Sequence, residues 1–114
     1  MAVQVETVND TIKMVRVDGR LDQTQNAELE QTLSSLLEGG SRQLLVDLSR
    51  TIYINSGGLR CLVTAWRKAR QQKGNLVLSG LNERLQEVFA MVGFDNVFQI
   101  YPTPVEAIVA YEES

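Results

Sequence analysis

The sequence predicts an α/β fold in which a mixed β-sheet packs with about four α-helices. An alternating apolar pattern at the start indicates an antiparallel hairpin, and later apolar runs are typical of strands that are covered on both faces. Helix-period patterns separate the later strands, which gives the order β-β-α-β-α-β-α-β-α. A hairpin followed by alternating units implies mostly parallel strands after the first pair.

The first elements are a predicted hairpin and a helix. Residues 3–8 and 12–17 alternate between apolar and polar side chains, with a turn signal between them. A helix follows, which Asp22 or Thr24 can cap, and Gly39-Gly40 predicts a left-handed end. Its apolar positions have the i, i+4, i+7, i+8 spacing of one buried face: Leu29, Leu33, Leu36 and Leu37.

The middle of the chain predicts a strand, a long helix and another strand. The first strand covers 43–48, and residues 49–55 are expected to form a connection. The helix is predicted from Ser56 to about Lys73, with Gly74 as its end, and the next strand covers 75–79. The buried stripe of the helix consists of Leu59, Leu62, Val63, Trp66 and Ala69.

The last third predicts a helix, an edge strand and a final helix. The first helix carries Leu85, Val88, Phe89 and Val92 and is closed by Gly93, and Met91 and Phe94 are expected to pack at its end. A short strand is predicted over 97–101. The final helix covers roughly 104–112, because a capping threonine, a proline and a glutamate stand at its start.

Length and charge restrict the classes of function. The 114 residues predict a single domain over 1–114, and 44% hydrophobic and 22% charged residues are ordinary for a globular protein. The net charge of -3 provides no global basic field for nucleic acid. Because no apolar run approaches the ~20 residues of a membrane span and no signal peptide is recognisable, we expect a cytoplasmic protein without a membrane partner.

The residue types disfavour catalysis. The chain has no histidine, so Ser–His and Cys–His nucleophilic pairs are absent. Cys61 is the one cysteine, which excludes an intrachain disulfide and argues against a zinc site. We therefore predict that the protein is not an enzyme and has no metal or cofactor.

The most informative stretch is the beginning of the long helix. Asn55 and Ser56 are preferred helix caps, and Gly57 and Gly58 have no side chains to cover the first amides. Such a helix start favours an anion, and a phosphate on a hydroxyl there would add roughly two negative charges. The alternative is that these residues only cap the helix.

The chain resembles the STAS domain family along nearly its whole length. The stretch 46–59 is similar to the family signature, in which a strand ending in Asp-Leu-Ser is followed by an aromatic residue, Ile-Asp-Ser and a long helix. Four further segments resemble family motifs in the same order: 19–22, 74–78, 85–95 and 97–107. The resemblance implies a STAS-like fold.

Stand-alone STAS proteins of this length are anti-sigma factor antagonists, also called anti-anti-sigma factors. The resemblance implies that the unphosphorylated protein binds an anti-sigma factor serine kinase, frees a sigma factor and so regulates transcription. The kinase would phosphorylate Ser56, and a PP2C-type phosphatase would transiently reverse the modification. The implied partner-binding residues are Asp22, Asn55, Ser56, Gly57, Gly58 and Leu59. The oligomeric state is left open.

The sequence departs from the family pattern at two positions. Asn55 stands where the family usually has aspartate, and Gly57 stands where Ser, Thr or Ala is common. An alternative function is therefore a non-phosphorylated STAS scaffold subunit of a lipid-transport ATPase or a sensory complex. The stand-alone length and Ser56 favour the antagonist, whereas Asn55 favours the scaffold. A small anion- or nucleotide-binding protein ranks last, because a P-loop and a Gly-x-Gly-x-x-Gly turn are missing.

Two further features have alternative interpretations. Asp22 is either the family's partner contact or a helix cap. Arg67, Lys68, Arg70 and Lys73 crowd the last turns of the long helix, where cations are favoured by the helix dipole. The sequence favours a solvated face for these cations over a surface for an acidic partner.

Overall fold

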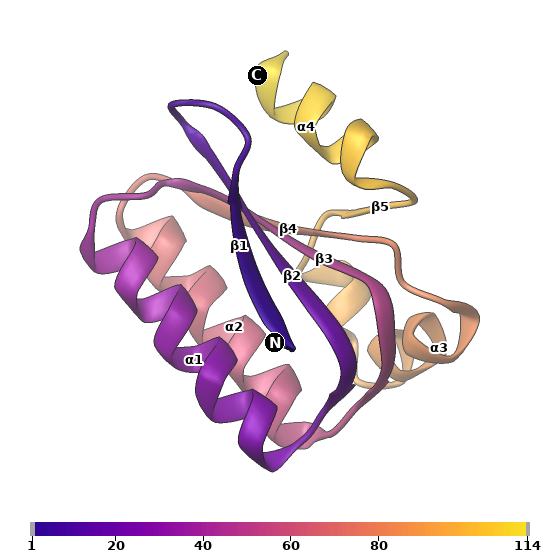
Figure 1. Ribbon diagram of the computed structural model, residues 1–114. Coiled ribbons are helices and arrows are strands. Elements are labelled where there is room, and N and C mark those ends of the chain that lie inside the picture. Colours follow the sequence, from indigo (N-terminus) through magenta and orange to yellow (C-terminus); the bar gives the residue numbers. More distant parts are fainter. Residues whose placement is uncertain (1, 114) are drawn as a thin grey trace.

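The computed structural model describes residues 2–113, and the predicted order of elements is confirmed (Figure 1). One five-stranded sheet in this part of the chain has the spatial order β1-β2-β3-β4-β5. The strands are β1 Val3–Thr7, β2 Ile12–Leu21, β3 Gln43–Ile54, β4 Asn75–Ser79 and β5 Ile100–Tyr101. The helices are α1 Gln23–Glu38, α2 Ser56–Gln71, α3 Glu83–Met91 and α4 Pro104–Glu112, with a short 3-10 helix at Phe94–Asn96.

The sheet is mixed, as the sequence predicts. β1 and β2 form an antiparallel hairpin in which Val3 lies opposite Val17, and β2 then pairs in parallel with β3. β4 and β5 continue the parallel part. Because parallel strands end at the same edge, the residues that follow β2 and β3 lie next to each other.

Helices cover the two faces of the sheet unequally. α1, α2 and α3 pack on one face, where they share the main core with strand residues such as Val46 and Leu76 (Figure 1). α4 packs on the other face over a smaller cluster that includes Leu45, Ala107 and Tyr111. The Tyr111 hydroxyl donates to the Leu44 carbonyl oxygen at 2.7 Å, so this ring fixes α4 to β3.

β3 is longer than predicted. The expected connection over 49–55 is wrong, because the strand continues to Ile54. The extension pairs with the end of β2, from Asp18 opposite Arg50 to Leu21 opposite Ile54, whereas the partner of Ser79 at the end of β4 is Asp47. The ends of β2 and β3 therefore run past β4 as a two-stranded ribbon.

A buried polar cluster lies where β4 ends beside β3. Asp47 is 2% exposed, and its carboxylate accepts from Arg16 Nε at 3.2 Å and from Ser79 Oγ at 3.1 Å. The backbone N–H and hydroxyl of Ser49 donate to the same carboxylate. Side chains from three strands thus meet at one aspartate.

The end of the α3 region differs from its prediction in two places. Phe94 packs edge-on against Phe89 and Phe98, as expected, but Met91 is 85% exposed, so its predicted packing is wrong. The predicted strand over 97–101 shortens to Ile100–Tyr101, because the 3-10 helix and the turn after it occupy the preceding residues.

The end of α2 also differs from the prediction. The helix stops at Gln71, and Lys73, not Gly74, adopts the left-handed conformation, with φ 65°. Gly74 is required for another reason, since a Cβ there would collide with the carbonyl oxygen of Arg42. No helix within the described residues is both long and apolar enough to cross a membrane.

Candidate phosphorylation and docking site

Ser56 is the first residue of α2 and is exposed, as the sequence predicts for a helix start. Its side chain makes no hydrogen bond to any residue from 2 to 113. A hydroxyl in this position is accessible to a modifying enzyme. Replacing Ser56 by alanine would therefore break no hydrogen bond with the described residues.

Asn55 holds the start of the helix in place. It is the N-cap, and its side-chain oxygen accepts from the Gly58 backbone N–H at 3.0 Å. Its own backbone N–H donates to the Leu21 carbonyl oxygen at 3.2 Å, so the β2–β3 ladder continues up to the cap. The sequence interpretation of open amides is therefore corrected at Gly58, whose N–H is already bonded.

Asn26 of α1 completes this arrangement and was not identified from the sequence. Its side-chain amide lies 2.8 Å from the Asn55 side-chain oxygen, and this contact ties α1 to the start of α2. A Cβ on Gly57 would lie 2.7 Å from Asn26 Nδ2, and one on Gly58 would lie 2.8 Å from Ile54 Cγ1. Both glycines therefore allow the two helix starts to approach closely.

Asp22 lies beside Asn55. Leu21 at the end of β2 pairs with Ile54 at the end of β3, and Asp22 and Asn55 are the next residues in the two strands' directions. Asp22 is the N-cap of α1, but its side chain makes no capping bond and instead accepts from Arg20 Nε at 3.4 Å. The predicted cap position is confirmed, and the predicted cap bond is not formed. The half-exposed carboxylate remains open to solvent near Ser56.

The other predicted contact residues lie beneath the surface. Leu59 is 8% exposed and belongs to the main core, and Gly58 is buried as well. Asn55 and Gly57 are half-buried. Of the predicted set, Ser56 is exposed, while Asp22, Asn55 and Gly57 are partly accessible.

The two-stranded ribbon at the ends of β2 and β3 carries an exposed surface. The sequence did not predict this surface, because residues 49–55 were expected to form a connection. Ile52 is 63% exposed and Tyr53 is 39% exposed, close in the chain to Ser56. The guanidinium of Arg20 lies over the Tyr53 ring, 4.3 Å from its centroid. Exposed apolar side chains that lie together are typical of a protein-docking surface.

Cys61 lies under the same helix start. It is buried, and its thiol donates to the Asn26 carbonyl oxygen at 3.5 Å. Burial raises the pKa of the Cys61 thiol, the Glu30 carboxylate raises it further, and Arg60 partly opposes both. Cys61 is therefore a packing residue between α1 and α2.

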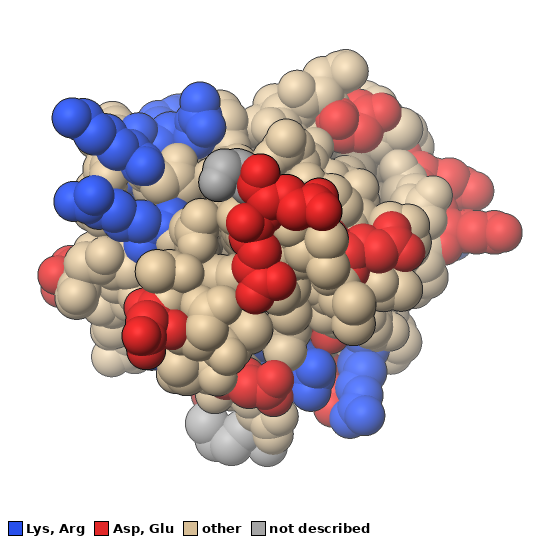
Figure 2. Space-filling model, turned by 90° about the horizontal axis from the view of Figure 1, so that it is seen from above, with Lys and Arg blue, Asp and Glu red and all other residues tan. Residues whose placement is uncertain are grey.

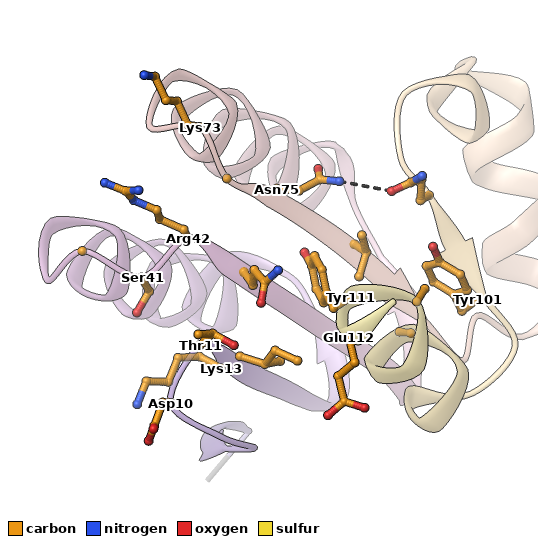
Figure 3. A pocket seen from close by; sticks show the side chains of 18 of the residues that line it. Asp10, Thr11, Lys13, Ser41, Arg42, Lys73, Asn75, Tyr101, Tyr111 and Glu112 are labelled. Atoms are coloured by element: carbon orange, nitrogen blue, oxygen red, sulfur yellow. Dashed lines mark hydrogen bonds between the residues drawn. The ribbon is translucent and has the colours of Figure 1, made fainter. Parts of the chain in front are cut away.

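A hollow of about 1080 Å³ opens at the opposite ends of the parallel strands (Figure 3). Arg42 and Lys73 stand at one side of it, and Tyr101 and Tyr111 stand at the other. Its lining contains no residue of the Ser56 region. Within residues 2–113, no group of three or more cysteine and acidic side chains is arranged to hold a metal ion.

Comparisons with known proteins place this arrangement in a family. The STAS domain model matches residues 2–107. BtrV of Bordetella bronchiseptica is 30% identical over 103 residues, covering 90% of this chain and 89% of its own. The anti-sigma-B factor antagonist of Staphylococcus epidermidis is 29% identical over 101 residues, covering 88% and 94%.

Solved structures agree on the fold. The Thermotoga maritima protein TM1081 has a TM-score of 0.88 at 20% identity and covers 95% of this chain and 92% of its own. The anti-sigma factor antagonist SpoIIAA from Bacillus has a TM-score of 0.80 in both its unphosphorylated and its phosphorylated form, at 17% and 21% identity. The unphosphorylated form covers 99% of each chain, and the phosphorylated form covers 96% of this chain and 99% of its own. The chain therefore belongs to the STAS domain family.

Proposed function

We propose that this chain is a cytoplasmic anti-sigma factor antagonist that binds an anti-sigma factor serine kinase and thereby releases a sigma factor. It acts by binding and not by catalysis. The observation that carries the proposal is the exposed, unbonded hydroxyl of Ser56 at the first position of α2. This hydroxyl occurs in a chain that is 29% identical to the anti-sigma-B factor antagonist of Staphylococcus epidermidis.

The docking surface in this proposal is the carboxyl edge of β2 and β3. Asp22 and Ser56 supply polar contacts there, while Ile52 and Tyr53 supply apolar area. Burying exposed apolar surface contributes roughly 25 cal/mol per Å², so the ribbon can provide affinity and the polar groups can provide specificity. Asn55, Gly58 and Leu59 support this surface from within.

Phosphorylation of Ser56 is the proposed control, and a PP2C-type phosphatase would remove the phosphate. The phosphate adds about two negative charges at the centre of the docking surface. It would be stabilised in the free protein by the positive end of α2. In the complex the phosphate would lose its hydration and would face the negative charge of Asp22. Both effects disfavour docking.

The scaffold subunit is the second candidate, and Asn55 is the specific observation that favours it. The family aspartate at this position would place a carboxylate next to the acceptor hydroxyl. In this chain the amide of Asn55 provides the helix cap without that charge. A chain that is never phosphorylated would still keep this cap.

A phosphorylation assay separates the two candidates. The partner is captured from the native lysate with the tagged chain, purified, and incubated with ATP and either wild type or Ser56→Ala. We expect an anti-sigma factor kinase that places one phosphate on Ser56 of the wild type and none on the variant. A captured transport ATPase that leaves Ser56 unmodified would support the scaffold and contradict the proposal.

A further inference from the structure

Helix α2 carries four exposed cations and no acidic residue. We call these residues the basic face of α2: Arg60, Arg67, Lys68 and Arg70. Within residues 2–113 the ion pairs are made by other arginines, so none of the four has an acidic partner in the folded chain. Their charges are therefore available to another molecule.

Part of the basic face lies on the same side of α2 as Ser56. With 3.6 residues per turn, positions four and eleven residues after Ser56 project to the same side, and these are Arg60 and Arg67. The opposite side of the helix faces the core through residues such as Leu62 and Ala69. The first cation thus lies one turn from the candidate phosphorylation site.

The helix dipole accounts for only part of this pattern. Lys68 and Arg70 lie in the last turn, where the dipole favours a cation. Arg60 lies in the second turn, near the positive end, where the dipole favours an anion instead. The helix dipole therefore does not account for a cation at Arg60.

The distribution of charge along the chain is equally uneven. Residues 41–73 contain seven of the eleven Lys and Arg residues but one of the fourteen Asp and Glu residues. Figure 2 shows one face of the molecule, where most cations gather at the corner that holds the end of α2, a smaller group lies at the lower edge, and acidic side chains are scattered over a largely uncharged surface. The molecule therefore has a localised positive surface despite its net charge of -3.

A groove runs beside the basic face, between α1 and α2. It has a volume of about 390 Å³, and its lining includes Gly57, Arg60, Cys61, Ala65 and Lys68. The groove therefore reaches from the residue after Ser56 to the far half of the helix. The groove also contains one acidic lining residue, Glu30 of α1, and its negative charge bounds the positive surface on the α1 side.

We propose that the basic face of α2 is a docking surface for an acidic surface of the anti-sigma factor kinase. This inference rests on the proposed function and extends its interface along the helix. From Ser56 to Gln71 the helix spans about 22 Å. The unpaired cations select an acidic partner, and the groove accepts side chains from that partner.

A protein surface fits this face better than a lipid surface. An amphipathic helix that binds a bilayer inserts large apolar side chains. The exposed large apolar residues of the described chain, among them Ile52, Met91 and Val105, belong to other elements and not to α2. A duplex nucleic acid is disfavoured by the acidic side chains around the basic corner (Figure 2).

The same arrangement links docking to phosphorylation. A phosphate on Ser56 would stand four residues before Arg60, the spacing at which opposite charges pair on a helix. An ion pair with the phosphate would neutralise the charge of Arg60, so this charge would no longer be available to the partner. Phosphorylation would then weaken the contact with an acidic partner in addition to placing charge at the docking surface.

Binding measured at low and high ionic strength tests the inference. The probe is the purified anti-sigma factor kinase, and the variants are Arg60→Glu, Arg67→Glu and, as the matched control, Arg84→Glu on the exposed surface of α3. We expect the α2 variants to lower the association rate and the affinity at least tenfold at low salt and to flatten the salt dependence. Arg84→Glu should bind like the wild type, and thermal unfolding should show that all three variants fold.

Each alternative outcome has a distinct meaning. If the α2 variants bind like Arg84→Glu while Ser56→Asp binds weakly, the inference is overturned and the proposed function stands. If the α2 variants instead lose retention on phosphatidylserine vesicles and keep their affinity for the kinase, the face is a membrane contact and the inference is wrong. If the wild type binds no anti-sigma factor kinase, the proposed function fails, and this inference fails with it.

Discussion

Asn55 shows how a single residue connects fold and function in this chain. The capping bond from the Gly58 backbone N–H uses the side-chain oxygen of Asn55 as its acceptor. A carboxylate retains this acceptor, so the aspartate that is usual in the family fits the same position. The departure from the family pattern therefore changes the charge beside Ser56 and not the cap.

We predict that Asn55→Asp raises the free energy of unfolding by about 0.3–1 kcal/mol, because a negative charge at a helix start is favoured. Asn55→Ala should lower it by about 1 kcal/mol, because the cap bond is lost. Chemical denaturation measures both changes. A loss of stability in Asn55→Asp as large as that in Asn55→Ala would contradict the assignment of the oxygen as the capping atom.

Cys61 provides a second test at the scale of one residue. Burial raises the pKa of its thiol, so the reactive thiolate is scarcer in the folded protein than in the unfolded chain at any pH below the raised value. We predict slow labelling by a thiol reagent in the native state and rapid labelling in denaturant at the same pH. Equal rates in both states would show that the thiol is accessible and that the α1–α2 contact is open.

At the scale of elements, the Asp47 cluster fixes the point where β3 separates from β4. The carboxylate is 2% exposed and joins Arg16, Ser49 and Ser79. A buried charge that loses its partners is costly, and so is a set of buried donors that loses its acceptor. The ribbon that follows, and with it the start of α2, depends on this junction.

We predict that Asp47→Ala lowers the free energy of unfolding by about 3–5 kcal/mol, because Arg16 and the two serines lose their common acceptor. The matched control is Asp18→Ala, which breaks an exposed pair with Arg50 at 3.8 Å. The control should cost about 0–1 kcal/mol in the same urea titration. Similar costs for the two variants would mean that the cluster does not hold the strands together.

The elements also show which parts of the structure could be predicted. The order of strands and helices followed from local patterns, and the start of α2 at Ser56 followed from its capping residues. The extension of β3 to Ile54 was missed, because it depends on pairing with Leu21, more than thirty residues earlier. Asn26 was missed for a similar reason, since nothing in α1 alone indicates that its amide reaches Asn55.

At the scale of the whole molecule, the two ends of the parallel strands differ. The carboxyl edge brings together Asp22, Asn55 and Ser56, which the family resemblance had assigned to one partner-binding set. The opposite edge contains the hollow beside Arg42 and Lys73 (Figure 3). α2 runs between these ends, so its cations connect the candidate phosphorylation site with the basic corner of the molecule.

The most direct test of the central claim is a binding titration of the anti-sigma factor kinase with wild type, Ser56→Asp and Ser56→Ala. Ser56 is exposed and unbonded among the described residues, so Ser56→Ala should keep both the fold and the affinity of the wild type. Ser56→Asp places a negative charge on the proposed docking surface and should weaken binding at least tenfold, or about 1.4 kcal/mol. Equal affinities for all three proteins would contradict control by charge at Ser56 and would leave the scaffold as the better account of this chain.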